Sequence, residues 1–213
     1  MTVQLSDHLT LDGVLYTVTG AEPYPIFHPD MLGIEVSPMG TWCWAGFLVE
    51  YEYKEGQLFA RSMNLGVFDD EPLVNGRKPD PRPKHAGSAL DLTPNLMPGL
   101  RYTDVWLPLE YSGEVTFGRD WWDYPRRRYY GSARSVDFNE IKQVLFLEGK
   151  IQKVTNISER FIEERNTLIE QEEEKRAKEW SIKERRLRRV RFKRKIMEFI
   201  TRKKQPMATH LFD

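Results

Sequence analysis

The sequence predicts an α+β protein, in which a mainly antiparallel β-domain of about eight strands precedes a long charged helix. Alternating apolar and polar runs separated by Gly-containing turns fill most of residues 1–156, as expected for strands joined by hairpins. A proline-rich stretch over residues 64–100 interrupts these runs and indicates a long loop. Residues 157–205 are highly charged and contain no proline, which indicates one helix, and residues 206–213 form a tail.

Four β-hairpins are predicted, because each pair of alternating runs flanks a short turn whose glycine tolerates positive φ. The paired runs are 9–11 with 14–18, 42–53 with 57–63, 102–109 with 114–117, and 141–147 with 150–154. The turns are Asp12-Gly13, Lys54-Glu55-Gly56, Tyr111-Ser112-Gly113 and Glu148-Gly149. Together these hairpins account for the predicted sheet.

The C-terminal helix is expected to run almost without a break over residues 159–203. Ser158 is the expected N-cap, and Pro206 lies beyond the far end. Oppositely charged side chains four residues apart stabilise such a helix in water. These pairs are Glu172–Arg176, Glu174–Lys178, Glu179–Lys183 and Glu184–Arg188. Apolar residues of the first turns are expected to pack on the β-domain, namely Phe161, Ile162, Leu168 and Ile169.

The formal net charge of zero conceals a strong polarity along the chain. Residues 1–156 carry 15 basic and 21 acidic groups, a net charge of −6. Residues 157–180 carry 5 basic and 8 acidic groups, whereas residues 181–204 carry 12 and 2, a net charge of +10. The end of the helix is therefore the main candidate for binding a negatively charged partner.

Cysteine and hydropathy exclude several classes of protein. Cys43 is the only cysteine, so an intramolecular disulfide and a cysteine-based zinc site are excluded, and a reducing compartment such as the cytosol is expected. No apolar run approaches the roughly 20 residues that span a bilayer, and the first residues lack the pattern of a signal peptide. No residue pattern identifies a catalytic activity, and no cofactor is expected.

The second predicted hairpin carries a distinctive pattern. Thr41-Trp42-Cys43-Trp44-Ala45-Gly46-Phe47 continues through Tyr51-Glu52-Tyr53 to Gly56-Gln57-Leu58-Phe59. This Trp-x-Gly-aromatic strand, paired through a Gly turn, resembles a family of uncharacterised small bacterial proteins. Residues 111–115 and the turn at Gly149 are similar to the remaining strands of that family. The resemblance covers residues 9–155 and implies a bacterial β-domain without an assigned activity, to which the long helix is an extension.

The first candidate binding surface is the basic part of the helix. Its residues are Lys183, Arg185, Arg186, Arg188, Arg189, Arg191, Lys193, Arg194 and Lys195. Placed at 100° per residue, these side chains surround the helix, whereas a helix that lies on a membrane separates an apolar face from a basic one. A nucleic acid or an acidic protein surface is therefore the expected partner. A solvated charged rod that only spaces domains is the alternative.

A second candidate surface combines aromatic rings with guanidinium groups, which stack on bases and neutralise phosphates. It consists of Trp121, Trp122, Arg126, Arg127 and Arg128, in a turn-rich bend expected after Gly118. The same residues could instead cap the sheet, with the stems of the arginines packed on the aromatic rings.

Metal-binding and nucleophilic sites have weaker support. His8, His28, His85 and His210 lack ligand spacing, and Cys43 between two tryptophans is expected to be a buried apolar residue. A metal-dependent nuclease or hydrolase would use Asp69, Asp70 or Asp120 with a Glu-x-Lys pair. That pair occurs at Glu52, Glu140, Glu148 and Glu173, so in a chain with 30% charged residues it carries little information.

Three functions remain open from the sequence. The first is a non-enzymatic interaction protein, whose β-domain binds or scaffolds a protein partner and whose basic helix contacts that partner or nucleic acid. The second is a component of a bacterial immunity or antitoxin-like system, in which the helical arm wraps a partner and orders on binding. The third is the metal-dependent nuclease or hydrolase.

Overall fold

The computed structural model describes residues 4–68, 70–81, 99–122 and 132–203. The chain divides into two compact units, Met1–Ile162 and Glu163–Asp213. The first unit, called the β-domain below, contains all the strands of the described residues and the first residues of the single α-helix. The predicted α+β fold is confirmed.

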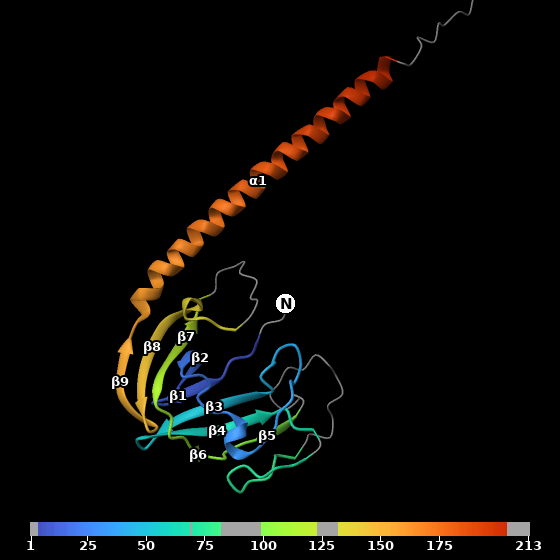
Figure 1. Ribbon diagram of the computed structural model, residues 1–213. Coiled ribbons are helices and arrows are strands. Elements are labelled where there is room, and N and C mark those ends of the chain that lie inside the picture. Colours follow the sequence, from blue (N-terminus) through green and yellow to red (C-terminus); the bar gives the residue numbers. More distant parts are fainter. Residues whose placement is uncertain (1–3, 69, 82–98, 123–131, 204–213) are drawn as a thin grey trace, which may run out of the picture. The chain divides into compact units, whose positions relative to one another are not determined.

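The strands form one sheet, in the order β5-β4-β3-β1-β2-β7-β8-β9, with β6 paired to β4 (Figure 1). The pair β1–β3 is parallel and the other pairs are antiparallel. The sheet is therefore mainly antiparallel, as predicted. The strands are β1 His8–Leu11, β2 Val14–Glu22, β3 Phe47–Lys54, β4 Gln57–Leu65, β5 Leu100–Tyr102, β6 Leu107–Pro108, β7 Gly113–Trp121, β8 Phe138–Leu147 and β9 Lys150–Asn156. Among the described residues, two short 3-10 helices, η1 Pro29–Leu32 and η3 Ser135–Asp137, lie in the connections.

Three of the predicted hairpins are confirmed, namely β1–β2, β3–β4 and β8–β9. In each turn both central residues have positive φ, which is the backbone geometry of a type I′ turn and fits the twist of the flanking strands. The φ values are 52° and 75° at Asp12-Gly13, 52° and 82° at Glu55-Gly56, and 49° and 75° at Glu148-Gly149.

The fourth predicted hairpin, 102–109 with 114–117, is wrong. Positive φ at Asp104 and Trp106, 51° and 48°, divides the first run into the short strands β5 and β6. Both pair with β4, and the Val105 N–H between them donates to the carbonyl of Arg61 at 2.8 Å. Strand β7 pairs instead with β2 and β8.

Two predicted boundaries also shift. The strand expected from residue 42 begins only at Phe47, because residues 40–43 form a tight turn closed by a bridge between Gly40 and Cys43. The loop predicted over 64–100 is shorter at both ends, since β4 continues to Leu65 and β5 begins at Leu100. Residues 82–98 of that loop lie outside the described residues.

One apolar core unites the sheet with the long connection between β2 and β3. It includes Tyr51, Tyr102, Phe117 and Phe146 from four strands and Phe27 from the connection, each less than 2% exposed. Aromatic side chains of this kind bury roughly 150–250 Å² each, so they provide much of the apolar burial that stabilises the domain.

The β8–β9 turn closes the curved sheet against β4. The Gly149 N–H donates to the carbonyl of Tyr111 and the Gly149 carbonyl accepts from the Leu58 N–H, both at 2.8 Å. The Ile151 N–H donates to the Tyr53 hydroxyl at 3.3 Å. The last strand of the sheet is therefore tied to a strand near its opposite end.

The helix α1 extends over Ser158–Lys203, which confirms the predicted long helix. The Ser158 hydroxyl accepts from the Ile141 N–H at 2.9 Å, so the start of the helix is attached to β8. Ile162, which was predicted to pack on the β-domain, is 44% exposed. Three predicted ion pairs are present, Glu172–Arg176 at 3.2 Å, Glu174–Lys178 at 3.2 Å and Glu184–Arg188 at 2.7 Å.

Candidate functional site

The basic segment, defined as residues 183–193 of α1, presents its charged side chains to solvent. Its basic residues are Lys183, Arg185, Arg186, Arg188, Arg189, Arg191 and Lys193, and all seven are exposed. Glu184 is the only acidic residue among them. Arg194 and Lys195 follow on the same helix, but their side chains lie outside the described part of the chain.

Few neighbours neutralise this charge. Arg188 pairs with Glu184 at 2.7 Å, and the Lys183 ammonium lies 5.7 Å from the centre of the Trp180 ring. Within the part of the chain that the structure describes, none of the other five basic side chains forms an ion pair. The segment therefore carries an almost uncompensated positive charge.

The basic segment has no continuous apolar face. Trp180 is 66% exposed, and Ile182, Leu187 and Val190 are also exposed. At 100° per residue these four side chains are interspersed with the basic ones. Two kinds of partner can be compared with this distribution. A partner that surrounds the helix with negative charge fits it better than a flat apolar surface does.

The aromatic candidate surface has a structural role in its described part. Strand β7 continues to Trp121, so the bend predicted after Gly118 does not begin before Trp122. The Trp121 ring packs edge-on against Phe138 at 4.9 Å between centroids, and the Trp122 N–H donates to the carbonyl of Asp137 at 2.8 Å. The remaining predicted residues, Arg126, Arg127 and Arg128, lie outside the described residues.

The carboxylates considered for metal binding lie on the surface where the structure describes them. Asp70 is exposed, and Asp120, also exposed, accepts from the Asn139 amide at 3.1 Å. In residues 4–68, 70–81, 99–122 and 132–203, no three His, Cys, Asp or Glu side chains form a group that could hold a metal ion. Asp69 lies outside these ranges.

Glu140, from one of the Glu-x-Lys pairs, is part of a charged network. Its carboxylate lies 3.2 Å from the Lys142 ammonium and is hydrogen-bonded to Arg119 and to the Tyr16 hydroxyl. Burial favours the protonated form, but these hydrogen bonds outweigh it and lower the pKa of Glu140. The carboxylate therefore serves as a partner for cations of the same sheet.

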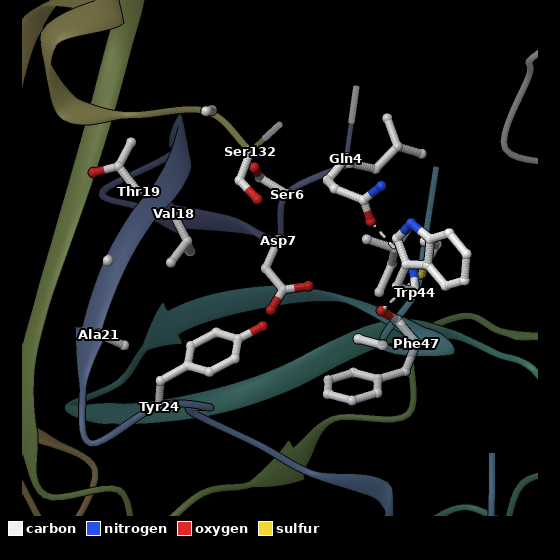
Figure 2. A pocket seen from close by; sticks show the side chains of 16 residues that line it. Gln4, Ser6, Asp7, Val18, Thr19, Ala21, Tyr24, Trp44, Phe47 and Ser132 are labelled. Carbon is white, nitrogen blue, oxygen red and sulfur yellow. Dashed lines mark hydrogen bonds between the residues drawn. The ribbon is translucent and has the colours of Figure 1, made fainter. Parts of the chain in front are cut away.

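A pocket of about 330 Å³ lies within the β-domain, between the N-terminal segment, β2 and the residues that precede β3 (Figure 2). Asp7 faces this pocket, and Ser6, Tyr24, Trp44, Phe47 and Ser132 are among the residues that line it. The N-terminal segment is held beside the loop before β3, because the Leu5 N–H donates to the carbonyl of Trp42 at 2.9 Å and the Trp44 N–H to the Gln4 side chain at 3.2 Å.

The Asp7 carboxyl group is held by strand β3. It accepts from the Val49 N–H at 2.8 Å and from the Tyr51 hydroxyl at 3.4 Å. Burial raises the pKa of Asp7 to about 6, although these two hydrogen bonds act in the opposite direction. A titratable group whose pKa is strongly shifted by burial in a pocket is a candidate for a functional site.

Besides burial, the charge of Asp7 raises the pKa values of two further groups, Tyr24 and Cys43. Partial burial and the Asp7 carboxylate raise the pKa of Tyr24, although the residue as a whole is 66% exposed. The Tyr24 hydroxyl points toward Asp7 in Figure 2. The pKa of Cys43 is raised by burial, which leaves the thiol protonated, and the sulfur lies 3.3 Å from the carbonyl of Phe47. Cys43 is 3% exposed, so its predicted burial is confirmed.

Replacement of Asp7 by Asn is expected to stabilise the β-domain at pH 7.5 and to change little at pH 3.5. In the folded protein the carboxyl group titrates at about 6, against 3.8 for its ordinary value, so the folded state binds the proton more tightly. The tighter proton binding stabilises the folded state by at most about 3 kcal/mol. This stabilisation is complete below pH 3.8 and is lost as the pH rises through 6. Urea unfolding of the wild type and of Asp7→Asn at several pH values from 3.5 to 7.5 measures the difference in their free energies of unfolding.

The exposed Asp70→Asn variant is a suitable control, because it removes the same charge from the surface of the domain. A difference between wild type and Asp7→Asn that stays constant with pH would contradict the expected burial effect.

The described residues thus define an α+β protein with two candidate binding surfaces, the basic segment and the pocket at Asp7. No helix within the described residues is long and apolar enough to cross a membrane. Comparisons with protein-family models, with curated proteins and with solved structures find no match for this chain.

Proposed function

We propose that this protein is a non-enzymatic nucleic-acid-binding protein, whose basic segment contacts the phosphate backbone. The observation that carries the proposal is the exposure of seven basic side chains on a helix that has a single acidic residue among them. Five of the seven are arginines, whose planar guanidinium groups bind phosphate through two parallel hydrogen bonds.

The distribution of charge around the helix favours nucleic acid over an acidic protein. A protein surface contacts one face of a helix, and the basic residues on the other faces would then contribute little. A helix in a nucleic-acid groove has phosphates on both sides, so basic residues on several faces find partners. Binding of this kind is governed by the release of counterions from the nucleic acid.

The proposal is tested by titrating a duplex DNA and a hairpin RNA with the full chain at several salt concentrations. Each neutralised phosphate contributes a slope of about −0.9 to a plot of log affinity against log salt on duplex DNA, so seven contacts give about −6. Fluorescence anisotropy of the labelled nucleic acid measures the affinity. Binding that does not depend on salt, or equal binding to polyglutamate, would contradict a phosphate contact.

The triple variant Arg185→Gln, Arg188→Gln, Arg189→Gln is expected to bind duplex DNA about tenfold or more weakly at 0.1 M salt, because three phosphate contacts are lost. The salt slope is expected to become less steep by up to about 3. These measurements use the same anisotropy titration.

The matched control is Lys175→Gln, Arg176→Gln, Lys178→Gln, which removes three positive charges from the same helix outside the basic segment. If the control loses as much affinity as the triple arginine variant, only the net charge matters and the basic segment is not the binding site.

A further inference from the structure

The pocket at Asp7 concerns a different part of the chain from the basic segment, and the argument for it does not depend on the proposed function. The pocket-lining residues within the described part of the chain include no Lys, Arg or His. The Asp7 carboxylate is therefore a partly buried negative charge without a cationic partner among these residues. Such a charge is costly unless a positive group compensates it.

The hydrogen bonds of Asp7 leave room for a ligand. A carboxylate can accept about four hydrogen bonds, and the contacts with Val49 and Tyr51 use two of them. The pocket adds hydroxyl groups from Ser6 and Tyr24, which can accept further hydrogen bonds. An ammonium group has three donors, a number that the remaining acceptors can satisfy.

Aromatic rings complete the recognition of a positive charge. Trp44, Tyr24 and Phe47 line the pocket, and the Trp44 side chain stands at its side in Figure 2. The negatively polarised faces of such rings attract cations. Trp44 is 64% exposed, so most of its ring surface is free to contact a ligand.

We propose that the pocket binds the primary ammonium group of an organic molecule, with Asp7 as counter-ion and Trp44 and Tyr24 as aromatic walls. The volume of about 330 Å³ is at the lower end of small-molecule sites, which span roughly 300–1,000 Å³. A metal ion fits less well, because Asp7 is the only carboxylate among the lining residues that the structure describes. The ammonium group comes either from a free amine or from a lysine side chain of a partner.

Isothermal titration calorimetry of the full chain with butylammonium and with Nα-acetyl-lysine methylamide tests the proposal and separates the two sources. Tighter binding of butylammonium indicates a free amine, whereas tighter binding of the lysine derivative indicates a protein side chain. Butanol and the Nε-acetylated lysine derivative are neutral controls. Absence of binding by both ammonium probes, or equal binding by the neutral controls, would overturn the proposal.

Two variants distinguish a site at Asp7 from general attraction to the acidic domain. Asp7→Asn keeps the shape of the side chain and is expected to weaken butylammonium binding at least tenfold, whereas the exposed Asp12→Asn removes the same charge and is expected to leave it unchanged. Trp44→Ala is expected to weaken binding about two- to fivefold. Unchanged binding by Asp7→Asn would overturn the proposal.

The pH dependence gives an independent readout, because an ammonium group binds the ionised form of Asp7. With a pKa of about 6, binding is expected to be about tenfold weaker at pH 5 than at pH 7.5. The pKa values of Tyr24, Tyr51 and Cys43 are raised by burial and stay above this range. Burial lowers the pKa of His8, with the charge of Glu50 acting against it, so the titration of His8 has to be separated from that of Asp7.

The Asp7→Asn variant retains His8, so it distinguishes the effect of Asp7 on the pH dependence of binding from the effect of His8. Loss of the pH dependence in Asp7→Asn assigns it to Asp7. An affinity of the wild type that does not change between pH 5 and 7.5 would overturn the proposal.

Discussion

Removal of residues 181–213 is expected to abolish binding to duplex DNA and to leave the thermal unfolding of the β-domain unchanged. The deleted residues belong to the second unit, whereas all members of the buried core lie in the first. The deletion removes the stretch 181–204, whose net charge of +10 supplies the attraction for phosphate in the proposed function. Circular dichroism melts and fluorescence anisotropy measure the two effects.

Deletion of residues 206–213 alone is the control, since it shortens the chain and keeps the basic segment. Retention of DNA affinity by the longer deletion would refute the proposed function. A fall of several degrees in its melting temperature would show that the helix stabilises the β-domain, because a loss of about 1 kcal/mol already shifts the melting temperature of a domain of this size by roughly 2–4 °C.

Replacement of Gly149 by Ala is expected to destabilise the β-domain by about 3 kcal/mol or more. At φ of 75° an added Cβ would lie 2.0 Å from the carbonyl oxygen of Leu109 and 2.1 Å from the amide nitrogen of Gln57. Leu109 cannot move away freely, because its N–H donates to the carbonyl of Leu58 at 2.9 Å and its carbonyl accepts from Gln57 at 2.7 Å. The substitution therefore strains the contact that closes the sheet.

Gly13→Ala and Gly56→Ala are matched controls for this substitution. Both glycines occupy the same position of a two-residue turn, with φ of 75° and 82°, but no atom lies within 4 Å of an added Cβ. Each is expected to cost only about 1–2 kcal/mol, which is the price of the left-handed backbone conformation. Urea unfolding compares the three variants, and equal losses would show that crowding at Gly149 has no effect.

The proposed phosphate contact and the proposed ammonium site use opposite charges in separate units of the chain. Neutralising Asp7 tests only the pocket, and neutralising Arg185, Arg188 and Arg189 tests only the basic segment. Failure of one proposal therefore leaves the other standing.

The sequence determined those features of this protein that depend on neighbours along the chain. The turns at Asp12-Gly13, Glu55-Gly56 and Glu148-Gly149 were predictable, because the conformation of a two-residue hairpin depends on the residues in it. The long helix was predictable because its stabilising pairs are four residues apart. The charge polarity follows directly from composition.

The order of the strands was decided only by the tertiary structure. Nothing local indicates that β1 pairs with β3 in parallel or that β7 lies between β2 and β8. The positive φ of Asp104 and Trp106 also lacked a signal, because neither is followed by the glycine that marks such turns. The run 102–109 pairs with β4 and not with residues 114–117, the partner that the sequence predicted.

The pocket at Asp7 likewise depended on residues that are distant in the sequence. Asp7 accepts hydrogen bonds from the N–H of Val49 and the hydroxyl of Tyr51, which lie 42 and 44 residues further along the chain. Ser132 lines the same cavity. A single aspartate before a strand has no pattern that distinguishes it from a surface residue. Only the packing of the N-terminal segment against the loop before β3 buries the carboxyl group, and burial is the physical cause of its raised pKa.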